Sequence, residues 1–220
     1  MKIALKNTLR RLGLFPAIDT ARRLPEIVRW LNDGCRGVAP PPIKRRVVQS
    51  YLRRYQLRTF TETGTHLGDT LAEVAQDPAL RAISVELADD YYAAAVRRFA
   101  SYPNVELHHG DSGQLMPQIV AGLKAPALFW LDGHYSGGTT AKGAMETPVS
   151  DELLAILASP VAGHVILVDD VRLFDGSHDY PQLDVFLAAI RAGGQYRAEI
   201  SADVLRLTPT GPRVVQESPV

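Results

Sequence analysis

The chain has 220 residues, of which 46% are hydrophobic and 22% are charged, as expected for a globular protein with one full core. The formal net charge is zero, and the single cysteine excludes an internal disulfide. Because no run of about 18 apolar residues is present, we expect no membrane span. The N-terminus lacks the apolar core of a signal peptide, which favours a cytoplasmic protein.

The charges are unevenly distributed along the chain. Residues 1–58 contain 14 lysines and arginines against 3 acidic residues, whereas residues 59–220 contain 10 against 21. The basic segment either packs on the acidic body or attracts an anionic substrate or surface. A nucleic-acid partner is disfavoured, because no binding motif with interleaved aromatic residues accompanies the basic ones.

Residues 1–56 are predicted to form helices separated by breaks. The segment PEIVRWLNDG begins with Pro25, which suits a first helical turn, and stops at Gly34. The three prolines at 40–42 predict a joint without helix. The helical period resumes in IKRRVVQSYLRRYQ. This helical N-terminal extension is predicted to serve as a lid or as an oligomer interface.

From residue 57 onward, short apolar runs alternate with helical patterns. The expected strands are LRTFTETG, RAISVELA, VELHHGD, ALFWLDGH and HVILVDD, and helical patterns separate them. This alternation predicts an α/β domain with a parallel sheet and helices on both faces, which is a doubly wound fold. A further helix ends at Gly193 and Gly194, and two last strands are predicted to form a hairpin around Ala202 and Asp203.

Each of the five expected strands ends at an acidic residue. These residues are Glu62, Glu86, Asp111, Asp132 and the pair Asp169 and Asp170. In an open parallel sheet, ligands bind beyond the carboxyl ends of the strands, so the carboxylates should meet at one mouth. Because crowded like charges repel, the cluster calls for a cation or for hydroxyl and amine donors.

The turn after the first strand narrows the class of ligand. Gly64 and Gly68 stand in an E-x-G-x-x-x-G spacing, which differs from the G-x-G-x-x-G turn of dinucleotide-binding proteins. Glu62 suits an ammonium group, and Glu86 stands where an acid binds ribose hydroxyls. The acid and serine after the third strand are placed to meet the exocyclic amine of an adenine. S-adenosylmethionine (SAM) combines these groups.

The motifs FTETGTHLGDT, AISVEL, VELHHGDS, FWLDGHYSGG and VILVDD resemble those of the class I SAM-dependent methyltransferases over residues 57–209. The E-T-G-T-H-L-G turn is similar to that of the catechol-type and macrolide-sugar-type O-methyltransferases. The resemblance implies a Rossmann-like methyltransferase fold over residues 57–220, with a mostly parallel seven-stranded sheet and one antiparallel strand. The SAM-binding residues that it implies are Glu62, Gly64, Gly68, Glu86, Asp111 and Ser112. Thr65 and Asp132 are further candidates for binding SAM. For Asp111, a helix N-cap is the alternative.

Asp132, Asp169 and Asp170 follow the fourth and fifth strands, which should be neighbours in the sheet. Three oxygen ligands from adjacent strand ends suit a divalent cation, with Mg²⁺ as the first choice. The resemblance to metal-dependent O-methyltransferases implies the same arrangement. Such an ion would lower the pKa of a substrate hydroxyl and hold its oxygen in line with the methyl group. Alternatively, Asp132 binds only SAM or substrate, and Asp169 caps the following segment.

The general base is predicted among residues near the fourth strand. The catechol-type enzymes have a lysine three residues after the first metal-binding acid, and Tyr135 stands at that offset here. The candidates are therefore His134, Tyr135 and Lys142. We choose His134, because imidazole titrates near neutral pH; a structural histidine is the alternative. The glycine-rich segment 135–148 is predicted to be a mobile lid or substrate loop, with a plain connection as the alternative.

Together these patterns predict a SAM-dependent O-methyltransferase, assisted by a divalent metal, that acts on a hydroxyl of a small polar molecule or sugar. The polar loops 135–148 and 175–181 favour a hydrophilic acceptor such as a glycan, and the apolar residues of the early helices favour a homo-oligomer. Three alternatives stay open. They are a SAM-binding protein without catalysis, a metal-independent methyltransferase for another acceptor, and a nicotinamide-dependent oxidoreductase. A nucleic-acid methyltransferase is a fourth, which the basic charge of residues 1–58 allows.

Overall fold

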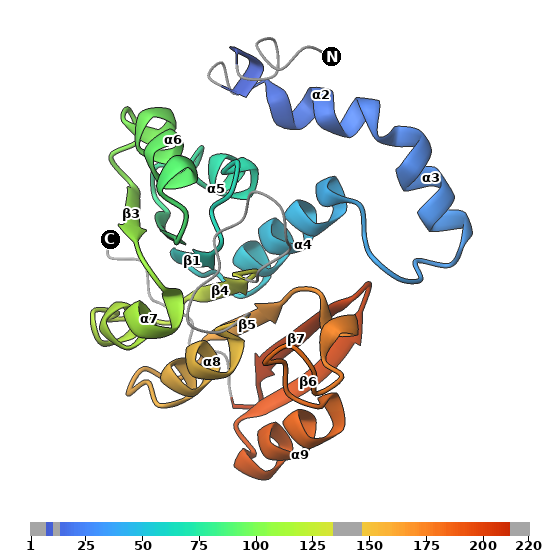
Figure 1. Ribbon diagram of the computed structural model, residues 1–220, viewed down its shortest axis with the longest axis vertical. Coiled ribbons are helices and arrows are strands. Elements are labelled where there is room, and N and C mark those ends of the chain that lie inside the picture. The colour runs from blue at the N-terminus through green and yellow to red at the C-terminus, as the bar shows by residue number, and fades with distance from the viewer. Residues whose placement is uncertain (1–7, 11–13, 134–146, 212–220) are drawn as a thin grey trace.

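The computed structural model describes residues 8–10, 14–133 and 147–211 (Figure 1). This part of the chain contains a seven-stranded sheet with the order β3-β2-β1-β4-β5-β7-β6. The strands are β1 (Thr59–Thr63), β2 (Arg81–Glu86), β3 (Val105–His109), β4 (Leu128–Leu131), β5 (Val165–Val168), β6 (Tyr196–Ser201) and β7 (Val204–Pro209). Strands β1 to β5 are parallel, and β7 runs antiparallel to both of its neighbours. The predicted sheet with one antiparallel strand is confirmed.

Helices cover both faces of the sheet, with α4, α5 and α6 on one face and α7, α8 and α9 on the other (Figure 1). The bounds are α2 (Phe15–Arg22), α3 (Leu24–Asn32), α4 (Pro41–Arg54), α5 (Asp69–Val74), α6 (Asp89–Phe99), α7 (Ser112–Ala121), α8 (Val149–Leu157), the 3-10 helix η1 (Val171–Leu173) and α9 (Leu183–Gly193). No helix within the described ranges is both long and apolar enough to cross a membrane.

Strands β4 and β5 are apolar in every residue because each of their faces meets a layer of helices. All four residues of β4 and all four of β5 are buried. Successive side chains of a strand point to opposite faces, so Phe129 packs with α7 and α8 while Trp130 packs with α4 and α5. The β6–β7 hairpin turns at Ala202 and Asp203, whose φ values of 56° and 65° suit a tight two-residue turn. The predicted hairpin is confirmed.

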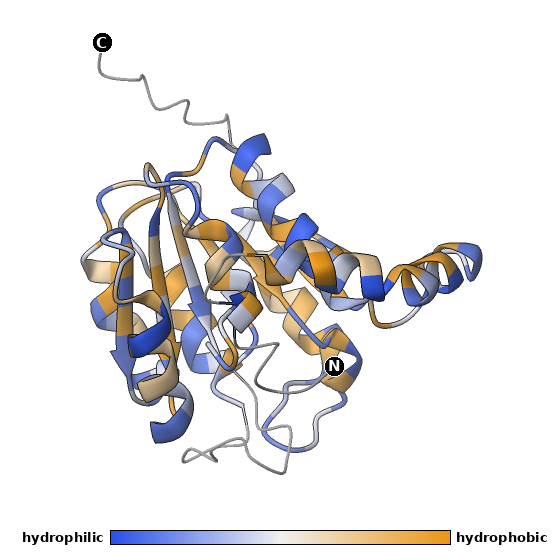
Figure 2. Cartoon of the chain, turned by 90° about the horizontal axis from the view of Figure 1, so that it is seen from above, coloured by the Kyte–Doolittle hydropathy of each residue, from blue (hydrophilic) through white to orange (hydrophobic). Residues whose placement is uncertain are grey.

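The N-terminal helices start differently from the prediction. The expectation that residues 40–42 contain no helix is wrong for two of them, because α4 begins at Pro41. The first N–H groups of a helix have no partner inside it, so Pro41 and Pro42 remove no hydrogen bond there. Only Pro40 stays outside, with extended backbone angles. Figures 1 and 2 show that α4 lies against the sheet while α3 projects from the body.

Candidate functional site

A cavity of about 430 Å³ lies beyond the carboxyl ends of β1, β4 and β5. This volume is within the range of small-molecule pockets. The turn that follows β1 forms one side of the cavity together with the acids after β4 and β5. The N-terminal helices α2 and α4 form the other side through Phe15, Asp19, Arg22, Pro41, Lys44 and Arg45. The acids after β1, β4 and β5 therefore meet at one mouth, whereas those after β2 and β3 do not line it, and the N-terminal extension is one of its walls.

The residues predicted to bind the cofactor divide into two groups. Those that line the cavity are Glu62, Gly64, Thr65, Gly68 and Asp132. Those that do not line it are Glu86, Asp111 and Ser112. The residues of the second group make hydrogen bonds within the protein.

Both glycines of the turn are required by the backbone itself. Gly64 has a φ of +79°, and a Cβ added to it would lie 2.6 Å from the carbonyl oxygen of Asp132. Gly68 has a φ of +67°, and a Cβ there would lie 2.8 Å from the ring of Phe99. Only glycine combines a positive φ with this lack of space. The ends of β1 and β4 thus come close together at the rim of the cavity.

Glu62 is a buried acid at the end of β1, with only 2% of its surface exposed. The hydroxyl of Ser84 donates to its Oε1 at 2.8 Å, and the Ser84 oxygen lies 2.6 Å from the hydroxyl of Thr65. Burial raises the pKa of Glu62 to about 8; the charges of Asp132 and Glu86 add to the rise, and the Ser84 hydrogen bond opposes it. Without a bound cation, Glu62 is therefore mainly protonated at neutral pH.

Glu86 holds the turn after β1 against the end of β2. Its Oε2 accepts from the backbone N–H of His66 at 2.7 Å, and its Oε1 accepts from that of Ala88 at 2.9 Å. Each oxygen of a carboxylate can accept more than one hydrogen bond, so these bonds leave acceptor capacity for a ligand.

The residues after β3 also have partners inside the fold. Asp111 accepts from the N–H of Gly113 at 2.9 Å, so the alternative role of this residue as a helix N-cap is realised. The Ser112 hydroxyl donates to Glu152 Oε1 at 2.5 Å. Burial raises the pKa of Glu152 to about 7. The sequence motifs do not point to Glu152, although its position among the apolar residues 149, 153 and 156 of one helix face is a signal.

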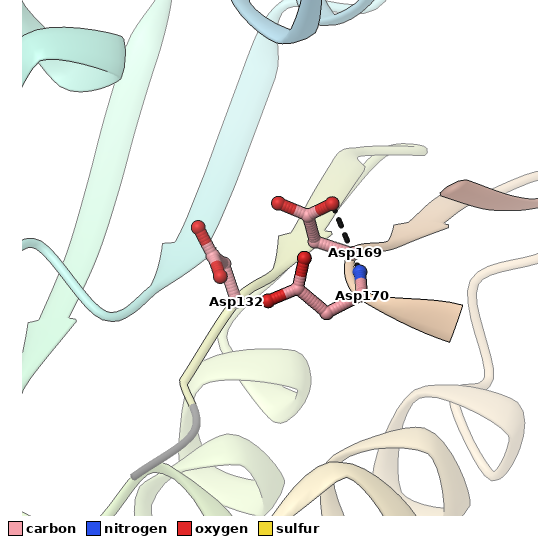
Figure 3. Close-up of side chains that lie close together, drawn as sticks. All are labelled: Asp132, Asp169 and Asp170. Atoms are coloured by element: carbon pink, nitrogen blue, oxygen red, sulfur yellow. Dashed lines mark hydrogen bonds between the residues drawn. The ribbon is translucent and has the colours of Figure 1, made fainter. Parts of the chain in front are cut away.

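The structure brings together the three aspartates that were predicted to hold a metal. Ligand oxygens of Asp132, Asp169 and Asp170 all lie within 4.8 Å of one another (Figure 3). Burial raises the pKa of Asp169; the charge of Asp132 adds to this rise, and Lys44 opposes it. Three carboxylates this close together can all stay ionised only if a cation lies beside them.

A cation of the chain itself lies in this cluster. Lys44 Nζ is 2.6 Å from Asp169 Oδ2 and 3.3 Å from Asp170 Oδ1. Burial alone would lower the pKa of Lys44, but the two aspartates hold it above its ordinary value, so the ammonium stays charged. A divalent ion on the same oxygens would lie next to this ammonium and be repelled by it. Lys44 in this position therefore competes with a divalent ion for the same carboxylate oxygens.

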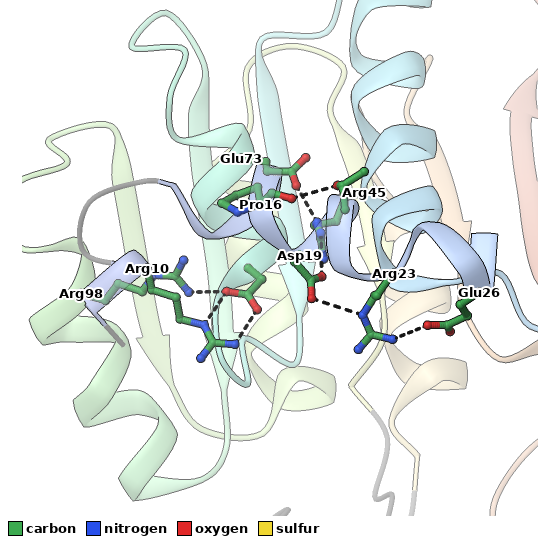
Figure 4. Close-up of polar contacts among 10 residues, drawn as sticks. Arg10, Pro16, Asp19, Arg23, Glu26, Arg45, Glu73 and Arg98 are labelled. Atoms are coloured by element: carbon green, nitrogen blue, oxygen red, sulfur yellow. Dashed lines mark hydrogen bonds and ion pairs between the residues drawn. The ribbon is translucent and has the colours of Figure 1, made fainter. Parts of the chain in front are cut away.

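Ion pairs join the N-terminal segment to α5 (Figure 4). Arg10 binds Asp69 through Nε at 2.8 Å and Nη2 at 2.9 Å. Arg45 joins Asp19 of α2 at 3.2 Å to Glu73 of α5 at 2.5 Å. The pairs connect residues that are 26 to 59 positions apart in the sequence.

The candidates for the general base, His134, Tyr135 and Lys142, lie outside the described residues. The same holds for most of the predicted loop 135–148.

No protein-family model matches the chain, and no curated protein matches it. Solved structures do resemble it. The O-methyltransferase TomG from Streptomyces achromogenes, in complex with SAM, is 19% identical, with 79% of this chain and 82% of TomG covered and a TM-score of 0.56. An O-methyltransferase from Bacillus cereus in complex with S-adenosylhomocysteine (SAH) is 16% identical, with coverages of 85% and 90% and a TM-score of 0.57.

The SAH-bound methyltransferase PaMTH1 from Podospora anserina is also 16% identical, with 79% of this chain and 80% of PaMTH1 covered and a TM-score of 0.57. At sequence identities this low, structural similarity shows that the fold is shared. The chain has the Rossmann-like fold of SAM-dependent O-methyltransferases, as its motifs predicted.

Proposed function

We propose that the protein is a SAM-dependent methyltransferase that acts on a hydroxyl of a small polar molecule or sugar. The observation that carries the proposal is the cavity at the carboxyl edge of the sheet, lined by Glu62, Gly64 and Asp132. Ligands of open α/β sheets bind at this edge. The same fold occurs in proteins solved with SAM or SAH.

In the proposed complex, the ammonium group of SAM approaches Glu62 and displaces its proton. The ionised carboxylate then pairs with the incoming cation, which offsets the cost of its burial. Gly64, Thr65 and Gly68 allow the methionine part to lie close to the backbone of the turn. The ribose extends beyond the cavity, and its hydroxyls donate to the acceptor capacity left on Glu86. The adenine lies toward the residues that follow β3, Asp111 and Ser112.

The proposed reaction is an in-line displacement. The acceptor oxygen forms a bond to the methyl carbon, the carbon–sulfur bond breaks, and its electron pair stays on sulfur to give SAH. We propose His134 as the residue that takes the hydroxyl proton. Opposite charges neutralise during this step, so exclusion of water from the cavity favours it. The N-terminal helices that wall the cavity support a role for residues 1–56 as its lid.

The N-terminal extension also offers a surface for self-association. Leu24, Val28 and Leu31 of α3 are 55%, 45% and 52% exposed and recur at helical spacing. A homo-oligomer that covers this face is therefore part of the proposal. Light scattering during gel filtration tests it, because Val28→Glu should convert the oligomer to a monomer.

The predicted divalent ion at Asp132, Asp169 and Asp170 takes no part in the proposed mechanism. It stays a prediction, and the ammonium of Lys44 at 2.6 Å from Asp169 speaks against it.

The class of methyl acceptor is inferred from the chemistry of the cavity. Its lining consists mainly of charged and polar residues. Polar hydroxyl compounds, including glycans, can form hydrogen bonds with such a lining. A flat apolar ring would leave the buried polar groups of the cavity without partners.

The experiment has two parts. Calorimetry with SAM and with NAD tests the cofactor, and we expect binding of SAM only. Methyl-labelled SAM is then incubated with sugars, nucleotide sugars and catechols, and SAH release is measured together with label in the acceptor. Failure to bind SAM would refute the proposal. Binding without transfer to any acceptor would favour a protein that keeps the cofactor but does not catalyse.

A further inference from the structure

The three aspartates at the ends of β4 and β5 need a cation, and two cationic side chains of the described residues form ion pairs with them. Arg172 Nη1 lies 2.7 Å from Asp170, but its side chain is 47% exposed and also pairs with Asp203. Lys44 is only 17% exposed and contacts two aspartates of the cluster. Lys44 is therefore the more buried of the two cations.

The position of Lys44 is set by a well-packed helix. Residues Val48, Tyr51 and Leu52 of α4 are buried against the sheet. The neighbouring Arg45 is 4% exposed and is tied to both Asp19 and Glu73. The backbone that carries Lys44 is thus held in place, and the aliphatic part of its side chain places the ammonium group at the cluster.

A divalent ion and this ammonium exclude each other. Mg²⁺ and Ca²⁺ bind carboxylate oxygens at about 2.0–2.6 Å, so an ion on Asp169 Oδ2 would lie within about 5 Å of Nζ. Three unit charges of the same sign would then share a buried site, where screening by water is weak. One of the two cations has to be absent.

We propose that Lys44 is the resident cation of this site and takes the place of a divalent metal. An ammonium group has three N–H donors, and two of them have acceptors in Asp169 and Asp170. Lys44 also lines the cavity. Given the proposed function, its third N–H donates to the acceptor oxygen and stabilises the negative charge that develops as the hydroxyl proton leaves.

The test is metal binding, which does not require a known acceptor. Mn²⁺ is titrated into the full chain and free Mn²⁺ is followed by electron paramagnetic resonance. We expect Lys44→Met to bind Mn²⁺ at least about tenfold more tightly than the wild type, because the ammonium is replaced by an uncharged side chain of similar length. Adding Asp169→Asn to this variant should abolish the gain.

Two controls show whether Mn²⁺ binding depends on the position of the positive charge or on the net charge of the protein. Arg53→Met removes a positive charge from an exposed position on the same helix and should leave Mn²⁺ binding as in the wild type. Lys44→Arg keeps the charge and should still exclude Mn²⁺. Circular dichroism reports whether each variant is folded, and Lys44→Gln replaces Lys44→Met if the latter unfolds.

Two results would overturn the assignment of Lys44. One is tight Mn²⁺ binding by the wild type, which is measured without any variant. The other is equal, weak binding by the wild type and a folded, uncharged Lys44 variant. SAM titrations of the same samples keep the proposed function separate: loss of SAM binding refutes that function, while the Mn²⁺ comparison still decides the role of Lys44.

Discussion

The buried carboxyl group of Glu62 should make the stability of the ligand-free protein depend on pH. Its pKa is raised to about 8 by burial, from an ordinary value of 4.5. Between these two values the folded state binds a proton that the unfolded state has released. Stability must therefore fall as pH rises through this window, and the whole contribution is lost above pH 8.

The size of the effect follows from the same two values. For one group with a pKa of 4.5 unfolded and about 8 folded, the free energy of unfolding should decrease by about 4 kcal/mol between pH 5 and pH 9. Glu62→Gln keeps the shape and the acceptor for Ser84 but cannot ionise. The variant should lack this part of the pH dependence and be more stable than the wild type at pH 9.

The assay is urea unfolding without SAM at several pH values from 5 to 9, for both proteins. Glu199→Gln, which changes an exposed carboxylate on β6, is the matched control and should behave as the wild type. Wild-type and Glu62→Gln curves that run parallel over the whole range would refute the reasoning. In that case Glu62 would be ionised in the folded protein and would need another partner.

Three further predictions concern single residues of the site. Glu86→Ala should weaken SAM binding about tenfold or more in calorimetry, since its carboxylate also fixes the turn that contacts the cofactor; unchanged affinity would contradict this role. Gly64→Ala places a Cβ 2.6 Å from a backbone oxygen at a positive φ and should cost about 1–3 kcal/mol in urea unfolding. Gly193→Ala, with nothing within 4 Å, is its control and should show no comparable loss. His134→Ala should lower turnover more than SAM affinity, and a wild-type rate at every pH would exclude His134 as the base.

Much of the sheet is predictable because strands buried on both faces consist of continuous apolar runs in the sequence. The runs LFWL and VILV are continuous where both faces of a strand are covered, and they form β4 and β5. Parallel strands place their carboxyl ends at one edge, so the sequence alone assigns Glu62 and Asp132 to the same mouth. The register confirms this placement, since Glu62 pairs with Trp130, two residues before Asp132.

The contents of the site depend on contacts that no local pattern encodes. Lys44 lies 125 residues before Asp169 in the sequence, and it reaches the cluster only because α4 docks on the sheet in one orientation. The start of α4 is also hard to place from sequence, because prolines that break a helix in its interior can begin one at its first turn. Glu152 is recognisable as an acid on an apolar helix face, but Ser112, its hydrogen-bond partner, lies 40 residues away.

The central claim is that the acids at the strand ends form a binding site for SAM. A crystal structure of the full chain grown with SAH tests it most directly. We expect the amino group of SAH at Glu62, in the cavity between the turn after β1 and α2, and its ribose hydroxyls beyond the cavity, at Glu86. SAH bound on another face, or a ribose remote from Glu86, would contradict the account.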